Sequence, residues 1–87
     1  MEFTSFVESL FKEKKVQKQN FDSGCSMIDV YINEVDMLVV QIEDDLIGVS
    51  LIKDYINYID LSTISDIVFT SNQEAENYLI SLGLHSV

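Results

Sequence analysis

The sequence contains no arginine, proline or tryptophan, and it has one cysteine, one histidine and three glycines. A lone cysteine cannot form an internal disulfide, which excludes a disulfide-stapled secreted mini-protein and favours a reducing compartment. One cysteine and one histidine are also too few for a structural zinc site. The glycines at positions 24, 48 and 83 are too scattered to form a phosphate-binding loop, so nucleotide binding is disfavoured.

Long apolar runs are absent as well. None approaches the roughly 18 residues that a membrane-spanning helix needs, and the first residues lack the basic and apolar segments of a signal peptide. We therefore expect a cytoplasmic protein. Because 47% of the residues are hydrophobic, and four Tyr and five Phe are present, the chain is too apolar for a disordered acidic tail. We expect a single small acidic α+β domain over residues 1–87.

No set of side chains indicates catalysis or metal binding. Cys25 and His85 are the only thiol and imidazole, and no third residue is placed to orient them as a nucleophile pair. The acidic run at residues 43–45 lacks the D-x-[DN]-x-[DN]-G pattern of a calcium-binding loop, so a solvated turn is the simpler interpretation. We therefore predict no enzyme, no metal and no cofactor.

What the sequence has in excess is negative charge. Fifteen Asp and Glu stand against five Lys, for a net charge of -10. Four of the lysines, Lys12, Lys14, Lys15 and Lys18, fall in one early segment. Direct nucleic-acid binding is disfavoured, because a protein that neutralises phosphates needs clustered cations and these four lysines, the only basic cluster, would not share one helical face. Dense carboxylates instead attract a Lys- and Arg-rich surface of another protein and compete with the phosphates that such a surface binds.

The N-terminal residues have apolar side chains at helical spacing. This predicts a helix from about Ser5 to Val16, opened by a capping box of Ser5 and Glu8. Its lysines would then lie in the last turns and complement the helix dipole. The following segment, Gln17 to Ser26, loses periodicity and predicts a connecting loop.

Strand patterns follow. Ile28, Val30 and Ile32 alternate with Asp29, Tyr31 and Asn33, which predicts a half-buried strand. Met37 to Ile42 is apolar on both faces as in a central strand, and Leu46 to Ile52 predicts a third strand. Short acidic turns at 34–36 and 43–45 connect them. They lie at opposite ends of the meander, so the acids could be dispersed and serve only solubility.

The remaining segments are less uniform. Residues 54–60 are compatible with an edge strand, a helical turn or an aromatic loop, and Ser62 to Phe69 could form another short strand. Ser71 and Glu74 repeat the capping-box pattern and begin a C-terminal helix that ends at Gly83.

The predicted fold class is α+β: an N-terminal helix, a three- to four-stranded antiparallel meander and a C-terminal helix, with the helices packed on one face of the sheet. The central strand has two sets of side chains, which are Met37, Val39 and Gln41 on one side and Leu38, Val40 and Ile42 on the other. Only one set can meet the helices. The other must be covered by residues 54–67 or by another chain, and this second face is where function is expected.

These observations predict a small acidic, non-enzymatic binding or inhibitor protein that occupies a basic, nucleic-acid-binding surface of a partner protein. In size, charge and lack of catalytic residues, the chain resembles phage anti-defence inhibitors and nuclease-immunity proteins as a class, and no motif identifies a family. The candidate partner-binding residues combine acids with tyrosines, which are favoured at interfaces. They are Glu43, Asp44, Asp45, Asp54, Tyr55, Tyr58 and Asp60.

An alternative stays open. The mean hydropathy of +0.16 is high for a small acidic chain, and a small monomer has limited interior in which to bury apolar side chains. A homo-oligomeric structural or regulatory module, such as a homodimer joined through the apolar second sheet face, would bury them. The tyrosines also have a second interpretation that needs no partner, in which Ile56 and Ile59 close the core and the tyrosines cover the edge of the sheet.

Overall fold

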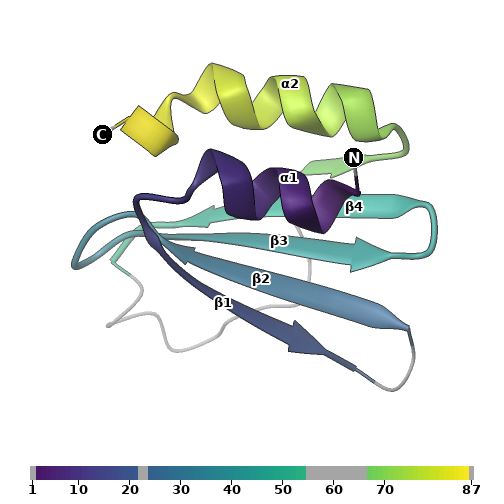
Figure 1. Cartoon of the computed structure of the whole chain (residues 1–87), viewed down its shortest axis with the longest axis horizontal. Coiled ribbons are helices and arrows are strands. Elements are labelled where there is room, and N and C mark those ends of the chain that lie inside the picture. Colours follow the sequence, from purple (N-terminus) through teal and green to yellow (C-terminus); the bar gives the residue numbers. More distant parts are fainter. Residues whose placement is uncertain (1, 22–23, 55–66, 87) are drawn as a thin grey trace.

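The computed structural model describes residues 2–21, 24–54 and 67–86, and it places two helices on one face of an antiparallel sheet (Figure 1). The elements in chain order are α1 Phe3–Leu10, β1 Lys15–Asn20, β2 Cys25–Tyr31, β3 Met37–Glu43, β4 Leu46–Ile52, β5 Ile67–Phe69, α2 Asn72–Leu82 and a 3₁₀ turn Leu84–Ser86. Each strand pairs with the next, in the order β1-β2-β3-β4-β5, so β3 lies at the centre.

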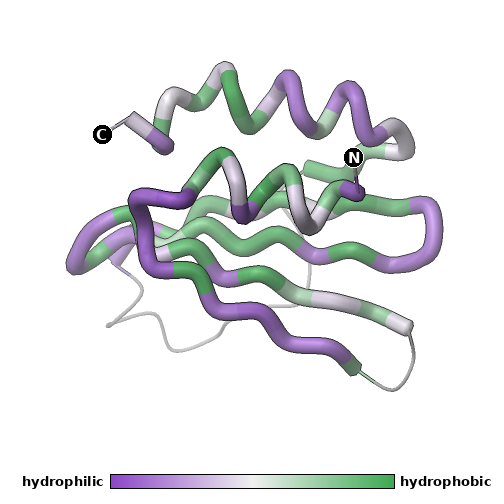
Figure 2. Tube along the Cα trace, viewed as in Figure 1, coloured by the Kyte–Doolittle hydropathy of each residue, from purple (hydrophilic) through white to green (hydrophobic). Residues whose placement is uncertain are grey.

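The core lies between the helices and one face of the sheet. Its largest fully buried side chains come from both layers: Phe11 follows α1, Leu79 belongs to α2, and Ile28 and Leu38 belong to β2 and β3. Figure 2 shows that the hydropathy of the strands follows their position in the sheet: β3 and β4 are mostly hydrophobic, and the edge strand β1 is mostly hydrophilic. Leu38, Val40 and Ile42 are the set of β3 side chains that pack with the helices.

The predicted helix from Ser5 to Val16 is wrong at both ends. The helix α1 spans Phe3–Leu10, its N-cap residue is Glu2, and no side chain caps it, so Ser5 and Glu8 do not form a capping box. Its last turn contains no basic residue. After Phe11 the apolar spacing stops, and the exposed residues that follow offer no face for the sheet to bury.

The predicted loop from Gln17 to Ser26 is wrong at both ends, since β2 already begins at Cys25. Lys15–Asn20 forms β1, which pairs with β2 from Lys15 opposite Tyr31 to Asn20 opposite Ser26. The backbone of β2 therefore supplies the hydrogen bonds that organise β1, although Val16 is its one apolar side chain. With β1 and β5 the sheet has five strands, not three or four.

The C-terminal half of the prediction holds better. β5 occupies the end of the segment Ser62 to Phe69, and residues 55–66 lie outside the described residues. Ser71 is the N-cap of α2, where its Oγ accepts a hydrogen bond from the Glu74 amide at 3.4 Å. Gly83 ends the helix with φ of 68°, a left-handed conformation that suits glycine. None of the described helices is long and apolar enough to cross a membrane.

Replacing Leu38 by Ala should lower the free energy of unfolding by about 2–5 kcal/mol, because the change removes buried methyl groups and leaves a cavity. Urea unfolding followed by circular dichroism measures this loss. Val35→Ala is the control, since Val35 is 46% exposed and the change should cost less than about 0.5 kcal/mol. Equal losses in the two variants would contradict the placement of the core.

Candidate partner-binding surface

The second face of the sheet, which points away from both helices, carries the candidate surface. Ile28 and Val30 of β2 are buried in the core beneath the helices. Because side chains alternate along a strand, Met27, Asp29 and Tyr31 lie on the opposite side of the sheet. The strand register then places Val39, Gln41 and Glu43 of β3 on the same side.

At one end of this face, β3 and β4 are joined by a turn of two residues, Asp44 and Asp45. Asp44 has φ of 49°, the left-handed conformation that tight hairpin turns require and that Asp tolerates better than most residues. Glu43, Asp44 and Asp45 are all exposed. Within the described residues none of the three makes an ion pair or a side-chain hydrogen bond.

An apolar pair lies beside these acids. Leu46, opposite Glu43 in the register, is 46% exposed, and Val68 of β5 is 54% exposed. Val68 is opposite Gly48, which has no side chain to separate it from Leu46 two residues earlier on β4. Such diagonal neighbours are roughly 7–8 Å apart. We define residues 43–46 as the hairpin tip, which combines uncompensated carboxylates with an exposed aliphatic side chain.

Asp29 lies farther along the same face, in the middle of β2. It is opposite Gln17 of β1 and Val39 of β3, and it is half-buried. No cation or hydrogen-bond donor among the described side chains contacts its carboxylate. Lys15 of β1 instead places its Nζ atom 5.3 Å from the centroid of the Tyr31 ring. Burial raises the pKa of Asp29 above its ordinary value, because the charged form is desolvated.

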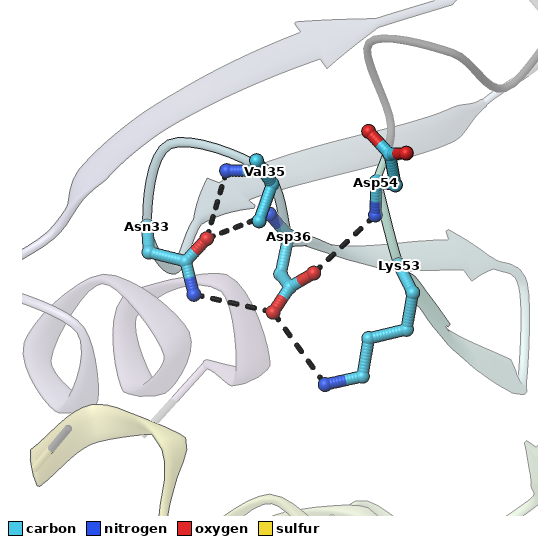
Figure 3. A network of polar contacts seen from close by, with 5 residues as sticks. All are labelled: Asn33, Val35, Asp36, Lys53 and Asp54. Carbon is cyan, nitrogen blue, oxygen red and sulfur yellow. Dashed lines mark hydrogen bonds and ion pairs between the residues drawn. The ribbon is translucent and has the colours of Figure 1, made fainter.

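A polar network at the opposite end of the sheet joins the β2–β3 turn to the end of β4 (Figure 3). The Oδ1 atom of Asn33 accepts hydrogen bonds from the Val35 and Asp36 amides, each at 2.8 Å. The Asp36 carboxylate accepts from Asn33 Nδ2 at 3.2 Å, the Asp54 amide at 3.3 Å and Lys53 Nζ at 3.5 Å. These contacts lower the pKa of Asp36, and the hydrogen bond from Asn33 is the largest cause.

The structure separates the acids of the predicted site. Glu43, Asp44 and Asp45 precede β4, whereas Asp54 follows it, so the full strand, roughly 20 Å long, lies between them. Asp54 belongs to the network around Asp36 instead. Tyr55, Tyr58 and Asp60 lie outside the described residues. The acidic turns at 34–36 and 43–45 do lie at opposite ends of the meander, as expected.

Sequence reasoning missed Asp29, Leu46 and Val68. For Asp29 the signal was present, since the alternation that buries Ile28 and Val30 also places Asp29 on the second face. For Val68 it was not, because its position beside Leu46 depends on the pairing of β5 with β4.

The lysines do not form one helical cluster, contrary to the sequence prediction. Lys15 and Lys18 lie on β1, and Lys18 Nζ is 3.9 Å from a Glu8 carboxylate oxygen.

His85 and Cys25, the two residues considered as a nucleophile pair, lie in different structural settings. The ring of His85 meets Phe11 edge to face at 6.4 Å between centroids, and Cys25 begins β2. Within the described residues, no group of His, Cys, Asp and Glu side chains is arranged to hold a metal ion.

Neither a family model nor a curated protein nor a solved structure matches this chain.

The contributions of Asp36 and Asp29 to the free energy of unfolding should change in opposite directions as pH rises. The pKa of Asp36 is lowered from 3.8, so its contribution is present above that value and is lost as pH falls through the folded-state pKa. Asp36→Asn should therefore unfold at lower urea concentration than wild type at pH 7, and the difference should shrink in acid. Asp45→Asn, at an exposed acid without a partner among the described residues, should match wild type. Equal effects of the two substitutions would contradict a structural role of the network.

The pKa of Asp29 is raised from 3.8, so its favourable contribution exists below that value and is lost as pH rises through the folded-state pKa. Asp29→Asn should therefore stabilise the protein at pH 7, by up to about 1 kcal/mol after allowance for solvent screening. The gain should vanish in acid. Urea unfolding across pH measures it, with Glu13→Gln as the exposed control. A less stable variant at pH 7 would show that the carboxylate has a stabilising partner.

Proposed function

We propose that this protein is a small acidic, non-enzymatic binding or inhibitor protein that occupies a basic, nucleic-acid-binding surface of a partner protein. The observation that carries the proposal is the hairpin tip, where three exposed carboxylates have no cation among the described residues and adjoin an exposed leucine. The tip and the second face form the contact surface in this proposal.

The charge favours such a partner in two ways. A net charge of -10 steers a cationic surface toward the protein and raises the association rate at low salt. A groove that binds phosphates already presents cations aimed outward, and the carboxylates of the tip would take the place of the phosphates. The exposed Leu46 and Val68 would add apolar contact, which charge alone does not provide.

The alternative, a homodimer through the second face, is supported by Met27 and Val39 on that face and by Val68 at its border. Two copies that each carry a net charge of -10 repel one another. Self-association should therefore strengthen as salt screens the repulsion, whereas binding to a basic partner should weaken. Light scattering at low and high salt separates these opposite trends.

The test of the proposal is affinity capture from a bacterial lysate at about 50 and about 300 mM salt, where screening differs strongly. A basic nucleic-acid-binding protein should be retained at low salt, released at high salt and displaced by added DNA. Reversing the three tip charges, in Glu43→Lys, Asp44→Lys and Asp45→Lys together, should reduce retention at least about tenfold, because close charge pairs couple strongly.

The matched control reverses three charges elsewhere, in Glu13→Lys, Glu74→Lys and Glu76→Lys together, so that the net charge is identical. Of these, Glu13 follows α1, and Glu74 and Glu76 belong to α2, so none lies on the second face. The control should retain most of the binding. A captured partner whose retention is unchanged by salt, or no basic partner at all, would refute the proposed function.

A further inference from the structure

Asp29 is an ionisable side chain at a position that suits an apolar or neutral one. Its neighbours on the second face are Met27 and Tyr31 on the same strand, Val39 opposite it on β3 and Gln17 opposite it on β1. Lys15, diagonal to it on β1, carries a positive charge, but its Nζ atom lies over the Tyr31 ring and makes no ion pair with Asp29. Among the described residues, no side chain donates a hydrogen bond to the Asp29 carboxylate. A half-buried carboxylate without compensation costs stability unless something else supplies a cation.

The adjoining Tyr31 is already engaged by side chains of β1. Its ring already holds the ammonium of Lys15, and its hydroxyl donates a hydrogen bond to Gln17 Oε1 at 3.2 Å. These contacts fix the edge of the site toward β1. The carboxylate of Asp29 remains for a cation from outside.

We propose that Asp29 receives an arginine side chain of a basic partner protein, and that the guanidinium lies across Met27 and Val39 while it pairs with the carboxylate. This inference rests on the proposed function and names the anchor within it. Arginine fits better than lysine because its planar, weakly hydrated guanidinium packs on apolar side chains and donates two parallel hydrogen bonds to one carboxylate. A second copy of this chain fits poorly, because it contains no arginine and carries a net charge of -10.

The register suggests the spacing of a second contact. Asp29 is opposite Val39, and Glu43 lies four residues farther along β3 on the same face. The two carboxylates are therefore roughly 13 Å apart. A partner segment that lies extended along β3 would reach both with cationic side chains four residues apart.

The probe is the peptide acetyl-Arg-Ala-Leu-Ala-Arg-amide, compared with the same peptide in which neutral, nearly isosteric citrulline replaces both arginines. Titration into labelled protein at low salt, followed by NMR chemical shifts, gives both the affinity and the location of binding. The arginine peptide should shift the signals of Asp29, Val39 and Glu43, and it should bind at least about tenfold more tightly than the citrulline peptide, since charge-assisted pairs are the strong ones.

Asp29→Asn should weaken the arginine peptide about tenfold, whereas Asp29→Glu should retain part of the affinity and Glu13→Gln should change it less than about twofold. Urea unfolding should show that Asp29→Asn is folded and at least as stable as wild type, so that the loss is not a loss of fold. Equal weakening by Asp29→Asn and Glu13→Gln, equal binding of the citrulline peptide, or no binding at all would overturn the anchor. Lysate capture with the tip variants would still decide the proposed function separately.

Discussion

The burial of Leu38 and Val40 of β3 beneath the two helices is the interaction on which the rest of the structure depends. Both side chains are fully buried, and β3 is the central strand of the sheet. A slip of one residue would bring Val39 and Gln41 into the core and expose the two aliphatic side chains. The register that this burial fixes also decides which carboxylates lie on the second face. The register of β3 therefore determines both the core and the candidate surface.

Two aspartates show how differently the same side chain is treated. Asp36 is satisfied by Asn33, Lys53 and the Asp54 amide, and its charge helps to hold two connections together. Asp29 has no such partners among the described residues, and its charge is a cost in the free protein. The Asp36 carboxylate already pairs with groups of the protein itself. The charge of Asp29 is not balanced by the described residues, so this carboxylate remains available to a partner.

The sequence predicted those elements whose pattern is local. β2 follows from alternation, β3 from a run that is apolar on both faces, and β4 from the apolar segment after the second acidic turn. The helix α2 follows from Ser71 and Gly83 at its ends. β1 could not be predicted in this way, because Val16 is its only apolar residue and the strand is organised by backbone pairing with β2, which leaves no side-chain pattern in the sequence. The candidate site divides likewise: the acids at 43–45 are adjacent in sequence, but the placement of Asp54 near Asp36 depends on how β4 runs back across the sheet.

The position of β1 at the border of the sheet has a consequence for how copies of this chain coexist. An edge strand presents backbone groups that can template pairing with another chain, and natural proteins often block such edges with lysine. In β1 that role falls to Lys15 and Lys18, which lie on opposite sides of the strand, one against Tyr31 and one near Glu8. Within the described residues β1 is the longer of the two edge strands, and two of the five lysines of this acidic chain lie on it, where their charge disfavours pairing with another copy.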